Sequence, residues 1–430
     1  MINFKEWKKI HFIGIGGIGT SAVARMMLLS GKSVTGSDTE ETPITDGLKK
    51  EGAKILIGHK EEHITSDMDA VLYTIAVKDD NPELKKARSF NIPTFSYPEA
   101  LGLISKGMFT IAVSGTHGKT TTTAMIGKIL KDADRSPTII VGSILVDGGT
   151  NFVPGTSDIL VVEACEYSRS FLHLNPNILV ITNIDSDHLD YYRDLQDIQS
   201  AFGELAQKVP KDGYIVTNPH DASVAPAIKE ARGQVIDYTS HDMTDVHLRV
   251  PGEHNILNAQ AALATAEILK IPRDTAIASL SNFKGTWRRF EYKGKIKNDA
   301  LIYDDYAHHP VEIKATLKAA RESFPGKRLI VIFQPHLYSR TKLLLDEFAA
   351  SFSDADKVII APIYAARENK IPGISSEILA EKIKAHNPNA VALSTFQEIQ
   401  EYVTEHAKKD DVIFTIGAGD IYKVAEQLTT

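Results

Sequence analysis

The sequence contains very little cysteine. Of its 430 residues only Cys165 is a cysteine, so the chain can form no internal disulfide and no cysteine cluster for a metal. It also has no apolar run of the length that crosses a membrane. The N-terminal segment lacks the basic and then apolar order of a secretory signal. From these absences we expect a cytoplasmic protein with no membrane partner.

Positive charge is not in excess. Lysine and arginine contribute 48 residues against 55 aspartates and glutamates, for a formal net charge of −7. Proteins that bind nucleic acid usually carry a basic surface, so we expect no nucleic-acid partner. The composition, 43% hydrophobic and 24% charged, is typical of a folded protein. A chain of this length divides into roughly two to four domains, and we expect three.

Apolar, β-rich runs alternate with helix-like segments along most of the chain. Such alternation predicts βαβ units around mostly parallel sheets, and therefore an α/β fold. Turn signals and changes in the series of strands place the domains at 1–106, 107–285 and 286–430. The predicted strands are 9–15, 54–57, 70–74, 109–114, 159–163, 178–184, 301–305, 328–333, 357–361 and 412–416.

A glycine-rich turn follows the first predicted strand. Gly14, Gly16, Gly17 and Gly19 stand between that strand and a helical pattern over 20–29. Glycines permit a tight turn, and the N–H groups at a helix start attract a diphosphate. Asp38, about 20 residues further on, is placed to bond a ribose hydroxyl. A dinucleotide and a UDP-sugar both fit, and a turn that serves only packing is the alternative.

A second phosphate loop follows the predicted strand 109–114. Backbone amides of such a loop cradle phosphates, Lys119 neutralises charge, and the Thr120 hydroxyl can reach Mg²⁺. Val113 occupies the position of the first glycine in the common form of this loop, so the loop is one residue shorter. The site predicts ATP binding. The predicted ATP-binding residues here are Gly115, Thr116, His117, Gly118, Lys119, Thr120 and Thr121.

Acidic side chains follow two later predicted strands. Glu163 and Glu166 end one strand, and Asp187 and His188 follow the next. The carboxyl ends of parallel strands share one edge, so these groups can converge near the ATP phosphates and hold Mg²⁺ through oxygen. Other roles remain open on chemistry alone: the glutamates could be solvated charges at the strand ends, and His188 could cap a segment or form an ordinary hydrogen bond instead of binding metal.

Two further segments carry polar residues in suggestive positions. Asn255 and Asn258 lie three residues apart, on one face of a predicted helix, where their amides can contact a nucleotide or simply cap the helix. Segments 288–291 and 304–310 combine charged, aromatic and histidine residues at an expected domain edge. Taken singly, such strings are ordinary surface charge.

Taken in order, these motifs resemble those of the Mur ligase family over essentially the whole chain. Agreement over so many ordered segments does not arise by chance. The segments that carry the resemblance are 12–19, 114–121, 163–167, 170–174, 182–188, 252–258, 285–291, 304–310 and 334–340. One departure is Leu337, which stands where the family's Gln-Pro-His-Arg motif has its arginine.

The resemblance implies a three-domain enzyme. A Rossmann-like first domain would hold a UDP-sugar, a central ATPase-like domain would bind ATP, and a Rossmann-like C-terminal domain would complete the site. The implied reaction adds L-alanine to the carboxylate of UDP-N-acetylmuramate through an acyl phosphate, as a step in peptidoglycan precursor synthesis. The chain could act as a monomer or a homodimer.

The resemblance also assigns roles to single residues. Lys119 would contact the ATP phosphates, with Glu163 and His188 as its partners in catalysis. Thr120, Glu163 and His188 would serve the Mg²⁺ sites. The remaining assignments are Asn255, Asn258, Arg289 and Asp305 for the nucleotide, and Tyr306, His308 and Arg340 for the incoming amino acid.

Three other functions remain open on the sequence. A related ligase that recycles a tripeptide onto the same UDP-sugar would share the ATP chemistry. An NAD(P)-dependent oxidoreductase would use the first glycine turn and Asp38, but it has no need for a second phosphate loop. A regulator that binds nucleotide without catalysis would keep both loops and form no amide.

Overall fold

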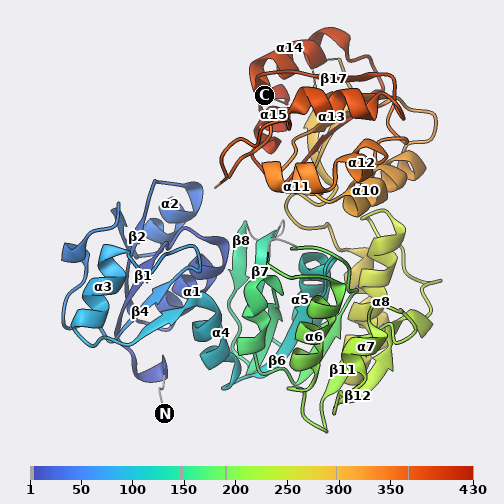
Figure 1. The fold of residues 1–430 in the computed structure, drawn as a ribbon. Coiled ribbons are helices and arrows are strands. Elements are labelled where there is room, and N and C mark those ends of the chain that lie inside the picture. Colours follow the sequence, from blue (N-terminus) through green and yellow to red (C-terminus); the bar gives the residue numbers. More distant parts are fainter. Residues whose placement is uncertain (1–3, 146–148, 189–190, 297, 367, 430) are drawn as a thin grey trace. The chain divides into compact units, whose positions relative to one another are not determined.

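The computed structural model describes residues 4–145, 149–188, 191–296, 298–366 and 368–429 (Figure 1). These residues form three β-sheets of five, seven and six strands, with helices packed against them. The predicted α/β class, with a sheet in each third of the chain, is confirmed. None of the helices within these ranges is long and apolar enough to cross a membrane.

The first sheet is parallel throughout, in the order β3-β2-β1-β4-β5. The strand order reverses between β1 and β4, and ligands of such sheets bind outside the carboxyl ends at this reversal. The first glycine turn leaves β1 at this place. The elements are η1 (Phe4–Glu6), β1 (Lys9–Ile13), α1 (Ile18–Leu29), β2 (Ser33–Asp38), α2 (Pro43–Lys50), β3 (Lys54–Ile57), η2 (Glu61–His63), β4 (Ala70–Tyr73), α3 (Pro82–Ser89), β5 (Thr94–Ser96) and α4 (Tyr97–Ser105).

A glutamate lies fully buried inside this first sheet region. Glu83, in the first turn of α3, accepts hydrogen bonds from the Ser37 hydroxyl at 2.5 Å and from the Lys60 N–H at 3.2 Å. Nδ1 of His63 lies 2.5 Å from Oε1, the oxygen that also accepts from Lys60, and Nε2 of His11 lies 3.6 Å from Oε2. Burial opposes the charge, but these partners outweigh it and lower the pKa of Glu83 to about 2.

Replacing Glu83 by glutamine should make the free energy of unfolding depend less on pH. A carboxyl group with a lowered native pKa stabilises the fold above its unfolded pKa of 4.5, and this contribution is lost as the pH falls from there toward about 2. We expect Glu83→Gln to lower the free energy of unfolding by about 3 kcal/mol at pH 7 and by much less near pH 3. Urea unfolding at several pH values measures this, with the exposed Glu62→Gln as control. An equal loss at every pH would contradict the assignment.

The second sheet has the order β12-β11-β10-β6-β9-β7-β8. Only β8 runs antiparallel to its neighbour, β7. Its central strands are apolar along their length because both faces are covered. The elements are β6 (Phe109–Ser114), α5 (Lys119–Asp132), β7 (Thr138–Leu145), β8 (Thr150–Val153), β9 (Ile159–Glu163), η3 (Tyr167–His173), β10 (Ile178–Ile181), α6 (Leu195–Ala206), β11 (Tyr214–Thr217), α7 (Ala225–Ile228), β12 (Gln234–Asp237), η4 (Tyr238–Ser240), α8 (Glu253–Ile268) and α9 (Arg273–Ser281).

The first two sheets share a hydrophobic core. One cluster of buried side chains includes Phe12 of β1, Leu101 of α4 and Phe171 of η3. Gly102 of α4 also lies against the backbone of His173, so that a side chain at this position would collide with it. The chain divides into two compact units, and both of these sheets belong to the first unit, which ends at Phe283. The predicted boundary near Lys106 lies inside this unit and stays a prediction.

The third sheet belongs to a second compact unit, which contains Lys284–Thr430 and the short segment Leu248–Ile256. Its order is β13-β14-β18-β15-β16-β17, with β13 antiparallel to β14. The elements are β13 (Glu291–Lys295), β14 (Leu301–Asp305), α10 (Pro310–Ser323), β15 (Leu329–Phe333), α11 (Tyr338–Leu343), α12 (Leu345–Ala349), β16 (Lys357–Ile360), α13 (Ser376–Ile383), β17 (Ala390–Ala392), α14 (Phe396–His406), β18 (Val412–Ile416) and α15 (Tyr422–Leu428).

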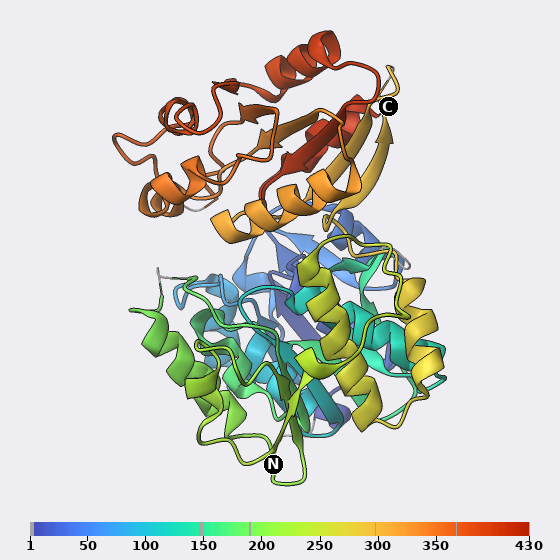
Figure 2. The same ribbon diagram turned by 90° about the vertical axis from the view of Figure 1, so that its right-hand side faces the viewer.

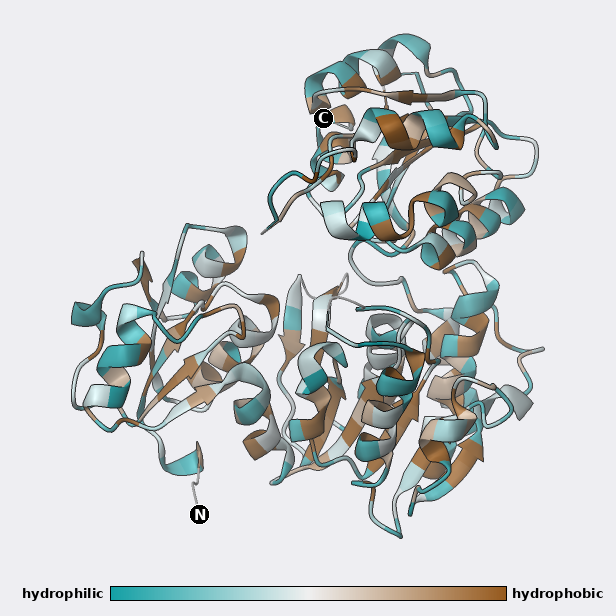
Figure 3. Ribbon diagram, viewed as in Figure 1, coloured by the Kyte–Doolittle hydropathy of each residue, from teal (hydrophilic) through white to brown (hydrophobic). Residues whose placement is uncertain are grey.

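Helices cover both faces of this third sheet. Side chains of α10 and α13 pack on one face, and side chains of α14 and α15 pack on the other. Figure 2 shows α10 and α14 on opposite sides of the strands. In Figure 3 the strands of this sheet are mostly brown, whereas its helices carry both teal and brown residues, as expected for helices with one face on a buried sheet.

All the strands predicted from the sequence are present. The largest difference is β10, which ends at Ile181 rather than at residue 184. Thr182 and Asn183 leave the sheet there and bond the phosphate loop instead. The antiparallel β7–β8 pair was not predicted, although 138–141 is a β-branched apolar run.

Candidate active site

The first glycine turn has the conformation that only glycine tolerates well. Gly14 has a φ of +74°, and a β-carbon there would collide with the side chain of Thr74 at the end of β4. Gly17 caps α1 without a side-chain hydrogen bond. A β-carbon at Gly19 would lie 2.5 Å from the ring of Tyr97. Glycine is therefore favoured at Gly14 and Gly19, and the turn leads into the start of α1, where helix N–H groups can receive a phosphate.

Asp38 braces this turn. Its Oδ2 accepts a hydrogen bond from the Gly16 N–H at 2.7 Å, and its Oδ1 accepts one from the Thr39 N–H at 2.8 Å. A carboxylate has further lone pairs beyond these two bonds. The predicted contact with a ribose hydroxyl therefore stays a prediction, and the structure adds a role in shaping the turn.

The second loop joins β6 to α5 as predicted. Gly118 caps α5 in the left-handed region, at a φ of +85°. The ammonium group of Lys119 curls back over the loop and donates to the carbonyl oxygens of Gly115, at 2.5 Å, and Thr116, at 2.9 Å. The positive charge is thus held at the mouth of the loop, where phosphates would bind.

An ion pair fixes Lys119. Its Nζ lies 2.8 Å from Oε1 of Glu166, whose side chain is buried. Burial alone would lower the pKa of Lys119, but the Glu166 carboxylate outweighs it and raises the pKa above its usual value. The lysine therefore stays charged. The backbone of Glu166 is held in turn, since the Tyr192 hydroxyl donates to its carbonyl oxygen at 2.5 Å.

The segment after β10 clamps the phosphate loop. The Thr182 hydroxyl donates to the carbonyl oxygen of His117 at 2.5 Å, and the Asn183 amide donates to the same oxygen at 3.0 Å. Oδ1 of Asn183 accepts from the His117 N–H at 2.9 Å. The Asp185 N–H donates to the Thr116 hydroxyl at 2.8 Å. These hydrogen bonds fix the conformation of the loop.

Thr120 and Glu163, which the resemblance assigns to Mg²⁺, are joined by a hydrogen bond. The Thr120 hydroxyl donates to Oε2 of Glu163 at 2.9 Å, and the Gly142 N–H donates to the same oxygen at 2.8 Å. A β-carbon at Gly142 would lie 2.5 Å from Oε1 of Glu163, so only glycine lets the carboxylate approach this strand. Gly142 belongs to β7, an element that the sequence did not point to.

Substituting Gly142 with alanine should damage the ATP site without unfolding the protein. The added methyl group would push the Glu163 carboxylate away from Thr120. We expect kcat/KM for ATP to fall by about tenfold or more, because groups at a phosphoryl-transfer site act through their placement. Steady-state kinetics at varied ATP and Mg²⁺ measure the change. Gly203→Ala in α6, where a β-carbon meets its nearest atom at 3.5 Å, is the matched control.

His188 lies beside Glu166 rather than directly on Glu163. Its Nε2 is 3.6 Å from Oε1 of Glu166 and its ring is 5.0 Å from that of Tyr167. Its φ of +54° is unusual for a residue other than glycine, and such backbone strain is concentrated at functional sites. Among the residues that the structure describes, no three His, Cys, Asp or Glu side chains form a ready metal cluster.

The two asparagines of α8 have separate environments. Asn258 is buried, and its Oδ1 accepts a hydrogen bond from the Thr122 hydroxyl of α5 at 3.1 Å. A β-carbon at Gly118 would collide with the same amide. Asn255 donates to the Pro251 carbonyl oxygen at 2.7 Å. Asn258 therefore supports the phosphate loop, whereas the nucleotide contact of Asn255 stays a prediction.

The predicted residues of the third sheet gather at its carboxyl edge. Asp305 is buried and accepts hydrogen bonds from the N–H groups of Phe290, at 2.7 Å, and Ala307, at 2.8 Å. Burial raises the pKa of Asp305 although the charge of Arg289 opposes the shift. The guanidinium of Arg289 lies over the Tyr306 ring at 5.2 Å. Asp305 thus orders the loop on which these residues lie.

The predicted amino-acid residues follow neighbouring strands of this unit. The rings of Tyr306 and His308, after β14, are 5.4 Å apart. His308 also lies 6.1 Å from the ring of His336, which follows β15. Arg340 lies on α11, one turn beyond Leu337, whose φ of +70° is strained for a branched side chain. The structure brings the two loops together, and their contact with an amino acid stays a prediction.

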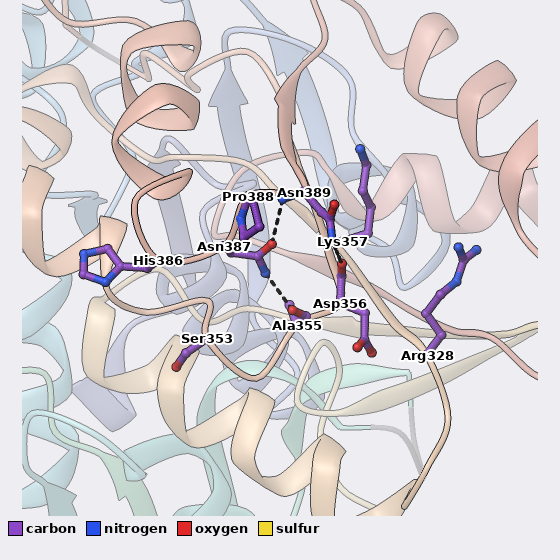
Figure 4. A pocket seen from close by; sticks show the side chains of 9 residues that line it. All are labelled: Arg328, Ser353, Ala355, Asp356, Lys357, His386, Asn387, Pro388 and Asn389. Atoms are coloured by element: carbon purple, nitrogen blue, oxygen red, sulfur yellow. Dashed lines mark hydrogen bonds between the residues drawn. The ribbon is translucent and has the colours of Figure 1, made fainter.

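A polar cavity of about 500 Å³ opens at the other end of this sheet (Figure 4). Arg328, Lys357 and Asn389 line it at the amino ends of β15, β16 and β17. Its amides bond the surrounding backbone, as Asn387 does to the Ala355 carbonyl oxygen at 2.6 Å. Ligands of such sheets bind at the carboxyl ends, so this cavity is not the candidate site.

Comparison with known proteins identifies the family. Residues 9–108 match the model of the Mur ligase family catalytic domain, 113–245 the Mur ligase middle domain, and 288–419 the Mur ligase glutamate ligase domain. The chain belongs to the Mur ligase family, and it is an ATP-dependent ligase.

Relatives and solved structures agree with this assignment. The UDP-N-acetylmuramate–L-alanine ligase of Acetivibrio thermocellus is 45% identical, covering 98% of this chain and 95% of its own. The enzyme of that name from Clostridium perfringens is 42% identical, covering 97% of both. The structure of the Thermotoga maritima UDP-N-acetylmuramate-alanine ligase superposes with a TM-score of 0.83 at 30% identity, covering 98% of both chains. A murein peptide ligase from Psychrobacter arcticus gives 0.70 at 25% identity, also over 98% of both.

Proposed function

We propose that this ligase adds L-alanine to the carboxylate of UDP-N-acetylmuramate in peptidoglycan precursor synthesis. The observation that carries the proposal is a pair of phosphate sites in one compact unit, the glycine turn at Gly14 and the loop at Lys119. The names of the relatives at 42% and 45% identity support the substrates. The use of ATP and the single Cys165 support a cytoplasmic location.

The chemistry needs ATP because a carboxylate resists attack by an amine. A carboxylate oxygen attacks the γ-phosphorus, the bond to ADP breaks, and an acyl phosphate forms. The amine nitrogen then attacks the acyl carbon, loses a proton and expels inorganic phosphate, which leaves the amide. Lys119, fixed by Glu166, stabilises the charge on the transferring oxygens, and the amides of its loop hold the phosphates.

The donor set near Lys119 fits Mg²⁺. Thr120 and Glu163 present hard oxygens 2.9 Å apart, and Oε2 of the buried Glu166 makes no hydrogen bond within the described residues. Mg²⁺ takes one or two protein oxygens together with water and phosphate oxygens, and it would supply positive charge along the phosphates. We assign Thr120 and Glu163 to this role and place His188 beside them through Glu166.

The incoming amino acid would meet the loops of the third sheet. Arg340 would pair with its carboxylate, because a guanidinium binds a carboxylate through two parallel hydrogen bonds. Tyr306 and His308 would line the space for its small side chain. Arg289 and Asp305 would complete the nucleotide site from the same unit, with Asn255 as a further contact.

The competing ligase function differs only in the amine. The fold is more similar to the alanine ligase structure, with a TM-score of 0.83, than to the murein peptide ligase structure, with a TM-score of 0.70. This difference favours L-alanine as the amine. Membership of the ligase family leaves the oxidoreductase alternative without support.

The test measures phosphate release from ATP and identifies the product by mass spectrometry. Reactions contain UDP-N-acetylmuramate and Mg²⁺ with L-alanine, with the stem tripeptide or with no amine. We expect phosphate and a new amide with L-alanine only. A higher kcat/KM for the tripeptide would show that the protein is the recycling ligase. Binding of ATP without amide formation would support a non-catalytic regulator.

A further inference from the structure

Asn151, on β8, is buried where the first two sheets meet. Its side-chain oxygen accepts a hydrogen bond from Nη1 of Arg25 at 2.8 Å. Its amide group donates to the carbonyl oxygen of Ile18 and, at 3.2 Å, to the hydroxyl of Ser21. A buried amide with three bonds is fixed in one orientation. Nothing in the motifs of the sequence singles this residue out.

The partners of Asn151 lie on α1, the helix that follows the glycine turn predicted to bind the diphosphate. Ile18 is the first residue of α1 and follows the glycine turn directly, and Ser21 closes the same helical turn. Arg25 lies one turn further along α1 and also donates to both carboxylate oxygens of Glu51 at 3.0 Å. Because Glu51 follows the last residue of α2, Arg25 links the end of α2 to Asn151. One asparagine therefore fixes the start of the helix on which the predicted UDP-sugar diphosphate would rest.

The strand of Asn151 leads directly to the ATP site. β8 pairs with β7 through Ile139 and Val153 and through Ile140 and Phe152. Two residues beyond Ile140, the Gly142 N–H holds Glu163, which in turn holds Thr120 of the phosphate loop. This hairpin is thus bonded at Asn151 to one phosphate site and at Gly142 to the other.

We propose that Asn151 is a positioning residue that sets the distance between the two phosphate sites. The inference rests on the proposed function, in which the carboxylate of the UDP-sugar must reach the γ-phosphorus of ATP. By donating to the first turn of α1, Asn151 holds the UDP-sugar in register with Glu163 and Thr120. The hydrogen bond from Arg25 orients the amide for this donation.

Loss of the amide should affect the reaction of the UDP-sugar more than the binding of ATP. Displacement of a reacting group by about 1 Å can cost roughly a hundredfold in rate. We expect Asn151→Ala to lower kcat/KM for UDP-N-acetylmuramate by about 30-fold and to leave the affinity for ADP within about twofold of the unchanged protein. We also expect more than one phosphate released per amide formed, because water competes with a displaced carboxylate.

Asn175→Ala is the matched control. Asn175 also bonds across the two sheet regions, from the end of η3 to the Ser105 hydroxyl at 3.3 Å and the Gly102 carbonyl oxygen at 3.5 Å, both in α4. These hydrogen bonds lead to α4 and to His173, and not to α1 or the β7–β8 pair. We expect a similar drop in melting temperature for both variants and unchanged kinetics for Asn175→Ala. Asn151→Asp, which keeps the Arg25 contact and loses the donation to α1, should behave as Asn151→Ala does.

The outcomes separate this inference from the proposed function. If the unchanged protein forms no amide, the proposed function fails first. If it forms the amide but Asn151→Ala matches Asn175→Ala in kcat/KM and in phosphate per amide, Asn151 has only a structural role and the inference is overturned. Full activity of Asn151→Asp would overturn it as well.

Discussion

Replacing Lys119 by methionine should lower kcat for amide formation by about 10³-fold. The ammonium group is held over the phosphate loop by Gly115, Thr116 and Glu166, where it would meet the charge that develops during phosphoryl transfer. Loss of one preorganised donor at such a site costs about 10²- to 10³-fold, and the lysine also carries a full charge. Phosphate release and amide formation under saturating substrates measure the loss.

The same change leaves the buried Glu166 without its cation. We therefore expect lower stability as well, by a few kcal/mol, and partial recovery in Lys119→Met with Glu166→Gln. The recovered double variant should remain inactive, which separates catalysis from folding. Lys131→Ala, at an exposed position on the same helix, is the control and should retain full activity. A kcat for Lys119→Met within tenfold of the unchanged protein would exclude this lysine from the chemistry.

Replacing Arg288 by methionine should lower the free energy of unfolding of the C-terminal unit by about 3–5 kcal/mol. Arg288 is 2% exposed, lies 2.6 Å from the fully buried Asp304, and donates to the carbonyl oxygens of Gly417 and Gly419. Without the guanidinium, Asp304 would be a buried charge with no cation. Burial already raises the pKa of Asp304 against the effect of Arg288, so the variant carboxyl group should take up a proton on folding.

The two tryptophans make this effect measurable in the whole chain. Trp287 lies beside the Arg288 guanidinium at 5.7 Å, whereas Trp7 packs on Phe95 in the first sheet region. In a Trp7→Phe background, the emission of Trp287 during denaturation therefore reports the C-terminal unit. The control is Lys314→Met, at an exposed position on α10 in the same unit, which should change stability little. Equal midpoints for the two variants would contradict the role of Arg288 as a core residue.

The sequence predicted those features that local patterns encode. Continuous apolar runs such as 109–114 and 412–416 identified buried parallel strands, because a strand covered on both faces shows no polar alternation. The glycine turn and the phosphate loop were predicted because glycine and lysine at fixed spacing have a direct physical meaning for phosphate. The shared edge of parallel strands predicted that Glu163 lies near the ATP phosphates, and the resemblance assigned it to Mg²⁺ together with Thr120; the structure places their oxygens 2.9 Å apart.

Features that depend on long-range pairing were not predicted. Glu166 was one of several acidic candidates, and only the fold shows that it binds Lys119 across 47 residues of sequence. No motif of the sequence singles out Glu83, which the fold surrounds with Ser37 and His63. Asn151 and Gly142 occupy an antiparallel hairpin whose sequence has no motif. In each case the partner is distant along the chain, so no local pattern contains the information.

The central claim is that the carboxylate of the UDP-sugar is activated by the γ-phosphoryl group of ATP at the Lys119 loop. The direct test uses UDP-N-acetylmuramate with ¹⁸O in both carboxylate oxygens, together with ATP, Mg²⁺ and L-alanine. An acyl phosphate passes one carboxylate oxygen to phosphorus, so the account predicts one ¹⁸O atom in each phosphate released and one in the amide. Phosphate without ¹⁸O, alongside amide formation, would contradict the account.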